Sequence, residues 1–368
     1  MSDQESDNDN KIGICRYNNI NGVTCYMNSI LHILQQIPIF SDYIFNCNFS
    51  QILKDKTTNL EEIKKTVSYE LYRLFNISRT RNNMSITPTS FRQCIGNKND
   101  TWTDNIHQDS QEFLNFLIST LEEEIGTPME FIAGRMHDTN KNTFITNILA
   151  EMAWKKFQAK EYSPLKEMFN GMTMIKTKCN CCSNVSNNFE PFTTLQLPIP
   201  VKDSKSEILK EFTLDECFDS LVKEEQLDKN NLYKCDLCGF KNKAFKTSLV
   251  WRTPKILIIH IKRFITNNNN KTQKLINNIK YPLYDLDLSN YISDDSPYKN
   301  NSKYNLIGIN LHQEFAFFGT NSGHYTSLVK NRTDNNWYLF NDGAEPIKAT
   351  KRDHIQNRNA YLLFYYKQ

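Results

Sequence analysis

The chain has no long hydrophobic run and almost no excess charge. Its mean hydropathy is −0.58, and no apolar segment reaches the roughly 20 residues that a membrane-spanning helix needs, which excludes a transmembrane protein. With 44 Lys and Arg against 41 Asp and Glu, the net charge of +3 is too small to argue for nucleic-acid binding. The first ten residues are acidic and polar, the reverse of the basic and then apolar order of a signal peptide. We therefore expect a cytoplasmic or nuclear protein with no membrane or nucleic-acid partner.

Glycine and proline are also scarce, with 11 of each in 368 residues. No Pro/Gly/Ser-rich linker divides the chain and no internal repeat is present, so the pattern favours one composite domain over residues 11–368. Residues 1–10 carry too little apolar surface to fold and are expected to form a disordered acidic tail. The run Asn267–Asn270 reads as a solvated insertion.

Hydrophobic periodicity changes along the chain. Apolar residues recur at helical spacing over about Cys25–Ile37, Gln108–Ile125 and Phe144–Phe157. Later segments are rich in β-branched and aromatic residues and several alternate, which predicts strands. These are Met172–Lys178, Leu195–Val201, Ile256–Phe264, Tyr304–Leu311, Tyr325–Lys330, Trp337–Phe340 and Ala360–Tyr366. A helical first half followed by a strand-rich second half predicts an α+β fold.

Four of the 10 cysteines form two C-x-x-C pairs, Cys179 with Cys182 and Cys235 with Cys238. In a reducing compartment cysteines are thiols or ligands more often than disulfides. Two such pairs, separated by the 52 residues 183–234, are typical of a zinc ribbon in which four thiolates hold a structural ion. Buried free cysteines and a thioredoxin-type redox motif are the alternatives.

Cys25 is a candidate nucleophile because it opens the first predicted helix. Unsatisfied N–H groups and the helix dipole at that position predict a lowered thiol pKa, although a lone cysteine at a helix start is more often inert. His324 lies in a glycine-flanked turn that enters a strand. Asn341 and Asp342 end the next strand, where either could accept the proton of the second ring nitrogen. Cys, His and Asn or Asp together are the arrangement of papain-like acyl transfer.

The order of several motifs resembles the ubiquitin-specific proteases. Gly22-Val-Thr-Cys25-Tyr-Met-Asn-Ser29 is similar to the cysteine box of that family, and Gly323-His-Tyr-Thr326 with Trp337–Asp342 is similar to its histidine box. Between them stand Gln108-Asp-Ser-Gln-Glu-Phe113, both C-x-x-C pairs and Pro254–Phe264, and Ala360–Tyr365 closes the series. The resemblance covers residues 12–368.

The resemblance implies a papain-like cysteine protease fold with a thumb over about residues 11–165, zinc-ribbon fingers over about 170–251 and a palm over about 252–368. It implies hydrolysis of the isopeptide or peptide bond after the C-terminal glycine of ubiquitin, with ubiquitin and ubiquitinated proteins as partners. Cys25 would be the nucleophile, His324 the general base and then acid, and Asn341 the orienting residue assisted by Asp342. Zn²⁺ would bind Cys179, Cys182, Cys235 and Cys238.

Asp109 and Glu112 resemble the carboxylates of the family that bind the arginine-containing tail of ubiquitin. Their spacing of three puts both on one helix face. The same pair reads as a capping box, with Asp109 as N-cap and Glu112 at N3. One carboxylate can serve both purposes.

The sequence departs from the family pattern at Ile20, where the family has an asparagine that donates to the oxyanion five residues before the nucleophile. An aliphatic side chain cannot donate, so Asn21 or Asn19 would supply this hydrogen bond, or backbone N–H groups alone would do so. A second departure is the apolar Phe315-Ala-Phe-Phe318 before His324, a candidate lid or substrate contact. A catalytically weak ubiquitin-binding scaffold, and a protease for a ubiquitin-like modifier, are therefore the alternative functions.

Overall fold

The computed structural model describes residues 15–46, 57, 59–81, 84–129, 141–159, 161–201, 210–228, 231–266, 272–315 and 322–368. Its contacts divide the chain into two compact units, residues 1–114 with 310–355 and residues 115–309 with 356–368. Both units combine two separate stretches of chain. The expected tail at residues 1–10 and the Asn267–Asn270 insertion lie outside the described residues. The thumb, fingers and palm boundaries stay a prediction.

The first unit is mainly helical. It contains η1 Ile20–Gly22, α1 Cys25–Gln36, α2 Pro38–Asn46, α4 Leu60–Ile63, α5 Val67–Thr80, α6 Thr89–Lys98, η2 Asp100–Trp102, the start of α7 Ser110–Ile125, and α11 Arg352–Ile355. All twelve residues of α1 are buried, so this helix is central in its unit. It ends one residue earlier than expected, because Ile37 precedes a proline and adopts an extended backbone.

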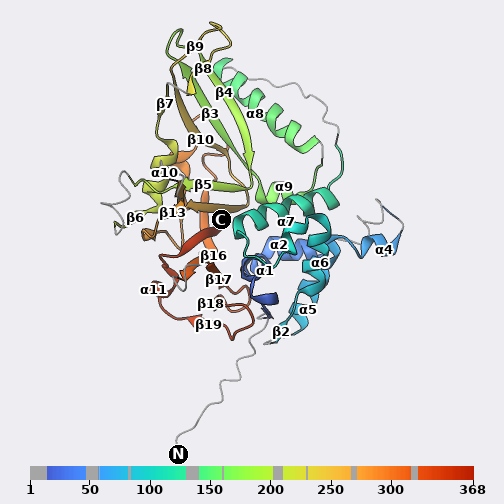
Figure 1. Cartoon of the computed structure of the whole chain (residues 1–368). Helices are drawn as coiled ribbons and strands as arrows, with labels where there is room; N and C mark the ends of the chain where they lie inside the picture. Colours follow the sequence, from blue (N-terminus) through green and yellow to red (C-terminus); the bar gives the residue numbers. More distant parts are fainter. Residues whose placement is uncertain are drawn as a thin grey trace, which may run out of the picture. The chain divides into compact units, whose positions relative to one another are not determined.

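The described strands of the first unit belong to two sheets, of which the larger packs against α1. They are β1 Arg16–Tyr17, β2 Ser85–Ile86, the end of β16 Lys303–Phe315, β17 Ser322–Lys330, β18 Trp337–Phe340 and β19 Ile347–Ala349. Strands β1 and β2 form a separate parallel pair. The order in the larger sheet is β19-β18-β17-β16, and β17 pairs antiparallel with β18 from Ser327↔Phe340 to Lys330↔Trp337. The two predicted strands thus form a hairpin. Figure 1 shows β17 beside α1, and the two elements pack together.

The second unit is mainly β. Its helices are the rest of α7, α8 Lys141–Ala159, α9 Pro164–Phe169, α10 Leu214–Val222 and η4 Ser289–Tyr291. Its longer strands are β3 Gly171–Cys179, β4 Val185–Phe192, β5 Thr194–Pro198, β10 Ala244–Arg252, β11 Ile256–Lys262, the start of β16, and β20 Ala360–Lys367. The shorter ones are β6 Phe212–Thr213, β7 Glu225–Leu227, β8 Tyr233–Lys234, β9 Lys241–Asn242, β12 Phe264–Thr266, β13 Thr272–Lys274, β14 Ile279–Lys280 and β15 Leu286–Asp287.

Two sheets organise this unit. One has the order β4-β3-β10-β7, and the strands of the other run β16-β20-β11-β5 with β15 beside β16. Strand β11 pairs antiparallel with β20 and parallel with β5. The fold is therefore mixed α+β, as expected.

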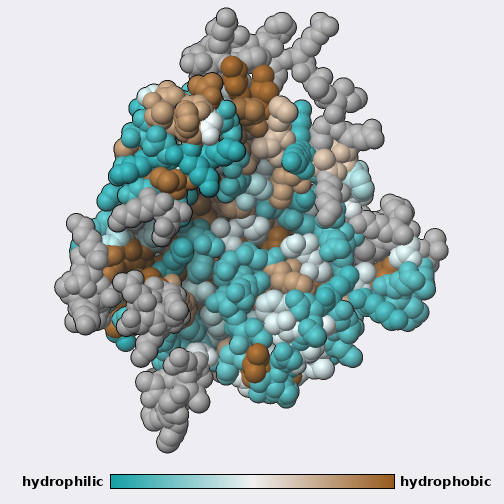
Figure 2. All heavy atoms as spheres, turned by 45° about the horizontal axis from the view of Figure 1, so that its top comes forward, coloured by the Kyte–Doolittle hydropathy of each residue, from teal (hydrophilic) through white to brown (hydrophobic). Residues whose placement is uncertain are grey.

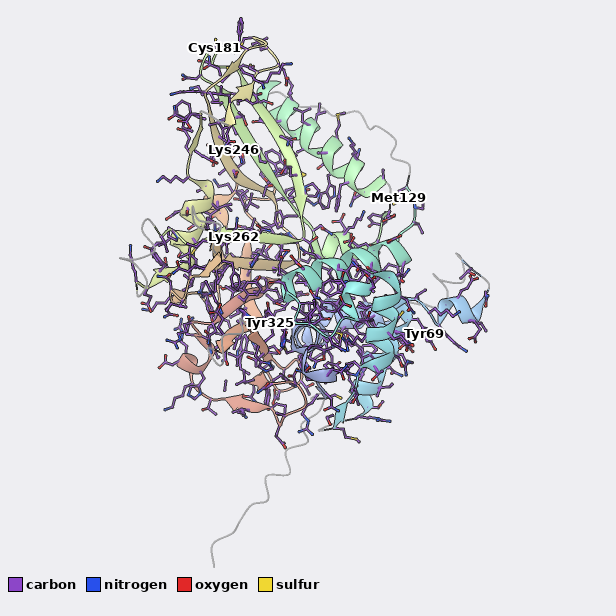
Figure 3. The ribbon with its side chains drawn as sticks, viewed as in Figure 1. Tyr69, Met129, Cys181, Lys246, Lys262 and Tyr325 are labelled. Atoms are coloured by element: carbon purple, nitrogen blue, oxygen red, sulfur yellow. The ribbon has the colours of Figure 1, made fainter. Side chains whose placement is uncertain are left out.

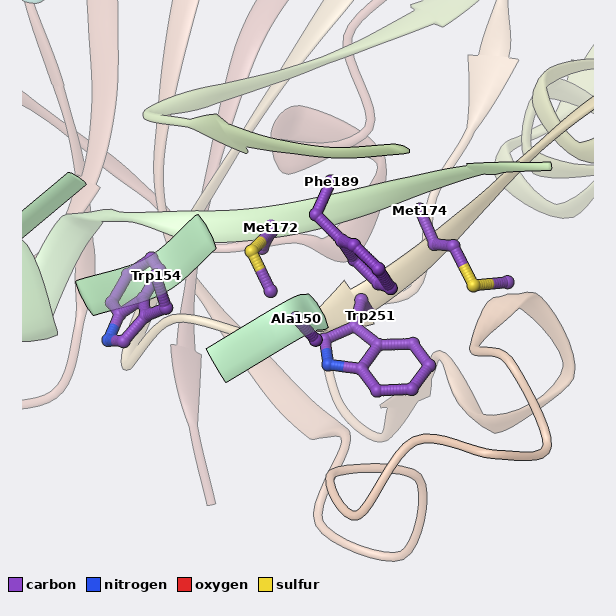
Figure 4. Close-up of a cluster of buried hydrophobic side chains, with 6 residues drawn as sticks. All are labelled: Ala150, Trp154, Met172, Met174, Phe189 and Trp251. Carbon is purple, nitrogen blue, oxygen red and sulfur yellow. The ribbon is translucent and has the colours of Figure 1, made fainter. Parts of the chain in front are cut away.

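Helix α8 covers the β3-β4-β10 surface with a compact apolar core. Ala150 and Trp154 of the helix meet side chains from all three strands, and each of the six side chains drawn in Figure 4 is at least nine-tenths buried. These residues are Ala150, Trp154, Met172, Met174, Phe189 and Trp251. The rings of Phe189 and Trp251 meet edge to face, 5.1 Å between centroids. This packing holds the long β3 and β10 strands that lead to the cysteine pairs.

The structure corrects two strand boundaries. The strand expected over Leu195–Val201 ends at Pro198, because proline cannot donate to a ladder. The strand expected over Ile256–Phe264 is interrupted at Arg263, whose buried guanidinium instead donates to backbone carbonyls of Ala360, Leu275 and Asn277.

Hydrophilic residues cover most of the face in Figure 2, with hydrophobic residues gathered near its upper end.

Candidate active site

The loop before Cys25 is held by hydrogen bonds that involve Asn19 and Thr24. Asn19 Oδ1 accepts from the backbone N–H of Thr24 at 2.7 Å and from its hydroxyl at 3.2 Å. The hydroxyl oxygen of Thr24 accepts from the backbone N–H of Ile20 at 2.8 Å. Asn21 and Gly22 both have left-handed φ values, +54° and +75°, so the chain turns tightly just before the helix. Cys25 is thereby fixed as the first residue of α1.

The Cys25 side chain is buried beside the strand that carries His324. Burial raises the pKa of the Cys25 thiol to about 11, while a hydrogen bond from the backbone N–H of Tyr325 acts in the opposite direction. The expectation that the helix start lowers this pKa is therefore wrong, because desolvation of the thiolate outweighs the nearby donors. The contact also brings the sulfur next to Tyr325, the residue after His324. The position of Tyr325 is labelled in Figure 3.

His324 and Asn341 are in direct contact. His324 Nε2 lies 2.7 Å from Asn341 Oδ1, across the β17-β18 hairpin. An amide oxygen only accepts, so this contact puts the ring proton on Nε2 and leaves Nδ1 as a proton acceptor in the neutral ring. The more distant Asp342 Oδ2 lies 3.8 Å from the same nitrogen.

Asp342 is held from several directions. Its Oδ1 accepts from Asn28 Nδ2 at 2.8 Å and its Oδ2 accepts from Asn19 Nδ2 at 2.9 Å. The backbone has φ +47°, a left-handed conformation that aspartate tolerates better than most residues. The His32 ring hydrogen-bonds to its backbone, and burial lowers the pKa of His32 to about 3, so that ring stays neutral.

The two candidate oxyanion donors are both engaged within this unit. The Nδ2 group of Asn19 donates to Asp342, and that of Asn21 donates to Asn105 Oδ1 at 2.9 Å. Their assignment to an oxyanion therefore stays a prediction.

Asp109 is the N-cap of α7. Its Oδ1 accepts from the backbone N–H groups of Gln111 at 2.7 Å and Glu112 at 3.2 Å, which confirms the capping interpretation of Asp109. Its Oδ2 accepts from the Tyr325 hydroxyl at 3.3 Å. The Glu112 side chain is exposed. Binding of a ubiquitin tail by these carboxylates stays a prediction.

Sequence reasoning missed several polar residues that support the site. Asn28 and His32 are one turn apart on α1 and both reach Asp342. Ser29 accepts from Asn310 Nδ2 at 2.8 Å, and Asn310 Oδ1 accepts from the Ser110 hydroxyl at 2.8 Å. These pairs tie α1 to β16 and α7. The available signal was the presence of Asn, Ser and His on the apolar face of a helix, where each buried polar group needs a partner.

The four C-x-x-C cysteines form a cluster that could hold a metal ion. Their sulfur atoms all lie within 4.8 Å of one another, with 4.0 Å between those of Cys179 and Cys238 and 3.6 Å between those of Cys182 and Cys235. A tetrahedral ion with bonds of about 2.3 Å to sulfur requires separations of about 3.8 Å. The residues therefore fit such an ion. Cys181 is exposed at the outer end of β3 and β4 (Figure 3).

The two knuckles of the cluster have the same backbone geometry. The residue after each second cysteine, Ser183 or Gly239, has a left-handed φ of +58° or +73°. Its N–H donates to the carbonyl of the first cysteine, at 3.0 Å for Cys179 and 2.9 Å for Cys235. Two unrelated segments thus turn in the same way to present two sulfurs each.

Two expectations cannot be compared with the structure. Residues 316–318 of the Phe315–Phe318 segment lie outside the described part of the chain, as does the acidic tail. Among the described residues, no helix is long and apolar enough to cross a membrane.

The fold is similar to that of a solved deubiquitinase assembly. The structure described as the SAGA Ubp8/Sgf11/Sus1/Sgf73 DUB module bound to ubiquitin aldehyde matches with a TM-score of 0.69 and 24% sequence identity, over 98% of this chain and 71% of that one. At this identity the likeness concerns the fold alone.

Curated relatives are similar over nearly all of this chain. Ubiquitin carboxyl-terminal hydrolase Usp2 of Drosophila melanogaster is 28% identical over 353 residues, covering 96% of this chain and 35% of the relative. Ubiquitin carboxyl-terminal hydrolase 4 of Saccharomyces cerevisiae is 29% identical over 377 residues, with coverages of 94% and 38%. Ubiquitin carboxyl-terminal hydrolase 2 of Homo sapiens is 28% identical over 348 residues, with coverages of 94% and 54%. The chain thus spans about a third to a half of the length of these relatives.

The model of one protein family covers the chain almost from end to end. It is described as ubiquitin carboxyl-terminal hydrolase and matches residues 15–365, a range that includes the cysteine loop, both C-x-x-C pairs and the β17-β18 hairpin. This chain therefore belongs to the ubiquitin carboxyl-terminal hydrolase family, a family of cysteine proteases.

Proposed function

We propose that this chain is a thiol-dependent deubiquitinase that hydrolyses the isopeptide or peptide bond after the C-terminal glycine of ubiquitin. The observation that carries the proposal is the 2.7 Å contact between His324 Nε2 and Asn341 Oδ1 on a hairpin packed against the helix that starts with Cys25. Family membership supports the same substrate class.

In this mechanism Cys25 needs His324 as its base. Because burial holds the thiol pKa near 11, few thiolates would exist at neutral pH without a proton acceptor. His324 Nδ1 takes the thiol proton, and the sulfur attacks the carbonyl carbon of the ubiquitin terminal glycine. The tetrahedral intermediate collapses as the imidazolium gives its proton to the leaving amine, which yields a thioester. Water, deprotonated by His324, then cleaves the thioester and restores the thiol.

Asn341 orients the imidazole through its Oδ1, and Asp342 assists by the charge of its carboxylate 3.8 Å from Nε2. The backbone N–H of Cys25 would stabilise the oxyanion, together with Asn19 or Asn21 if either amide turns from its present partner. Loss of one oxyanion donor costs about 10²–10³ in kcat. Ile20 is therefore the observation that favours a second candidate, a ubiquitin-binding scaffold with weak catalysis.

Substrate recognition would use Asp109 and Glu112. A partly exposed N-cap carboxylate and an exposed carboxylate three residues later form an acidic edge for a basic ubiquitin tail. A ubiquitin-like modifier with a similar tail is the alternative substrate. We further propose a cytoplasmic or nuclear location and no membrane or nucleic-acid partner.

The cysteine cluster would hold a structural Zn²⁺ through Cys179, Cys182, Cys235 and Cys238. Four thiolates leave no open coordination position, so the ion cross-links the ends of the fingers and takes no part in hydrolysis. The left-handed turns after each pair orient the sulfurs.

The decisive experiment combines a fluorogenic amide of the ubiquitin C-terminus with an electrophilic ubiquitin probe. We expect wild type to release the fluorophore and to form a probe adduct at Cys25, located by mass spectrometry. Cys25→Ala should abolish both and still bind ubiquitin. Turnover by Cys25→Ala contradicts the nucleophile assignment, whereas ubiquitin binding without a wild-type adduct supports the scaffold. Probes built on ubiquitin-like modifiers identify the preferred substrate.

A further inference from the structure

A cavity lies in the first unit, at the end of α1 opposite Cys25. It has a volume of about 240 Å³, and its walls include Gln36 from α1, Ser41 and Phe45 from α2, Arg79 from α5, and Arg332 with Thr333 from the turn between β17 and β18. The proposed hydrolysis uses none of these residues. The volume is below the 300–1,000 Å³ of typical pockets for drug-sized ligands, so it suits a small group.

Positive charge exceeds negative charge around this cavity. Arg332 Nη2 pairs with Asp42 Oδ1 at 2.8 Å, and its Nη1 donates to the Ser41 hydroxyl. The Arg79 guanidinium lies over the Phe45 ring, 4.8 Å from its centroid. Among the described residues no carboxylate pairs with Arg79. Two arginines therefore line one cavity, and one of them is paired with a carboxylate.

Backbone hydrogen bonds hold the turn that carries Arg332. The backbone N–H of Arg332 donates to Gln36 Oε1 at 3.2 Å, which ties the turn to the end of α1. The neighbouring Thr333 N–H donates to Asn331 Oδ1 at 2.8 Å, so the turn is itself braced. A cation in the last turn of α5 also balances the helix dipole, but that role does not require the aromatic support of Phe45 or a second arginine in the same cavity.

We propose that this cavity binds a phosphate group through Arg79 and Arg332, with the Ser41 and Thr333 hydroxyls as additional donors. A phosphate group carries about −1.5 to −2 charges at neutral pH and three strong acceptor oxygens. Two guanidinium groups and two hydroxyls can donate to all three phosphate oxygens, whereas a carboxylate offers two acceptor oxygens. The ligand is either free phosphate or a phosphorylated side chain of a protein. This proposal is independent of the chemistry at Cys25.

The test is calorimetric titration of the full chain with inorganic phosphate, a phosphoserine peptide, the same peptide without phosphate, and acetate, all at one ionic strength. We expect saturable binding of phosphate or of the phosphoserine peptide, and none of acetate or the unmodified peptide. Preference for the phosphoserine peptide identifies a modified protein as the source, and preference for the free ion identifies inorganic phosphate. Absence of saturable binding of both inorganic phosphate and the phosphoserine peptide, or equal binding of acetate, overturns the proposal.

Variants locate the site. Arg79→Gln and Arg332→Gln should each weaken binding about tenfold or more, because each removes a charge-assisted hydrogen bond. Asp42→Asn should strengthen it, since a competing carboxylate is removed. The matched control is Arg73→Gln on the same helix, whose guanidinium is already paired with Glu70 at 2.7 Å. Equal weakening by Arg73→Gln would mean that only overall charge matters and would overturn the site, as would no effect of Arg79→Gln.

Discussion

Asn19 Nδ2 lies 2.9 Å from Asp342 Oδ2, although the two residues are 323 positions apart in the sequence. The contact joins the loop that precedes the candidate nucleophile to the residue that follows Asn341. Because Asn28 donates to the other oxygen of the same carboxylate, Asp342 links the start of α1 to the end of β18 by hydrogen bonds.

The hydrogen bond between Asn19 and Asp342 predicts a stability effect for Asn19→Ala. The substitution removes a donor to Asp342 and an acceptor for the Thr24 N–H, so the free energy of unfolding should fall by about 1–3 kcal/mol. Urea unfolding measures the change. Asn105→Ala is the matched control, because its Oδ1 accepts an exposed hydrogen bond from Asn21 and its backbone is not left-handed. An equal loss of unfolding free energy in both variants would show that the hydrogen bond between Asn19 and Asp342 makes no specific contribution to stability.

Asn341 and Asp342 should differ in what they affect. Asn341→Ala removes the acceptor 2.7 Å from the imidazole and should lower kcat about 10²-fold with little change in stability. Asp342→Ala should lower kcat less but cost about 1–3 kcal/mol in unfolding free energy, since it leaves two amide donors without their acceptor. Steady-state kinetics with the fluorogenic ubiquitin amide and urea unfolding separate the two effects. The reverse order of kcat values would assign the orienting role to Asp342.

The buried thiol predicts a pH dependence when its base is removed. Burial raises the pKa of Cys25 from 9.0 to about 11, so in His324→Ala the thiol stays protonated at neutral pH and alkylation should accelerate only above about pH 9. The raised pKa also means that its contribution to folding stability is complete below pH 9 and is lost as the pH rises through 11.

Alkylation by iodoacetamide, followed by mass spectrometry, checks this prediction. Exposed Cys181 serves as the internal control in the same sample, because its side chain is open to the reagent. Rapid alkylation of Cys25 at neutral pH in His324→Ala would contradict the account of its activation.

The cysteine cluster predicts zinc dependence of stability. Purified protein should hold one zinc ion per chain, and Cys182→Ser should lose it and lower the unfolding free energy by several kcal/mol, on the order expected for a structural site. Cys181→Ser is the control, since its sulfur is outside the cluster. Elemental analysis and thermal unfolding, each with and without a chelator, provide the measurements. Wild-type protein without zinc and with unchanged stability would argue for a cluster of free thiols.

Local patterns were enough to predict α1 and the strands β3, β5, β11, β16, β17, β18 and β20. They failed for β4, because Val185-Ser-Asn-Asn-Phe-Glu-Pro-Phe192 has too few apolar residues to stand out as a strand. That strand exists because β3 pairs with it and Phe189 packs on Trp251. Such pairing is non-local and leaves little trace in one short segment.

By itself, the sequence determined the α+β class, the cysteine pairs and the identity of Cys25, His324 and Asn341 as candidates, because residue type, spacing and order are local properties. Only the tertiary structure decided that Cys25 is too buried for a lowered pKa. It also decided that Asn19 and Asn28 donate hydrogen bonds to Asp342, and that two arginines from distant segments line one cavity. Burial and partner choice depend on which surfaces meet after folding, and the desolvation and hydrogen bonds that follow from them cannot be derived from neighbouring residues alone.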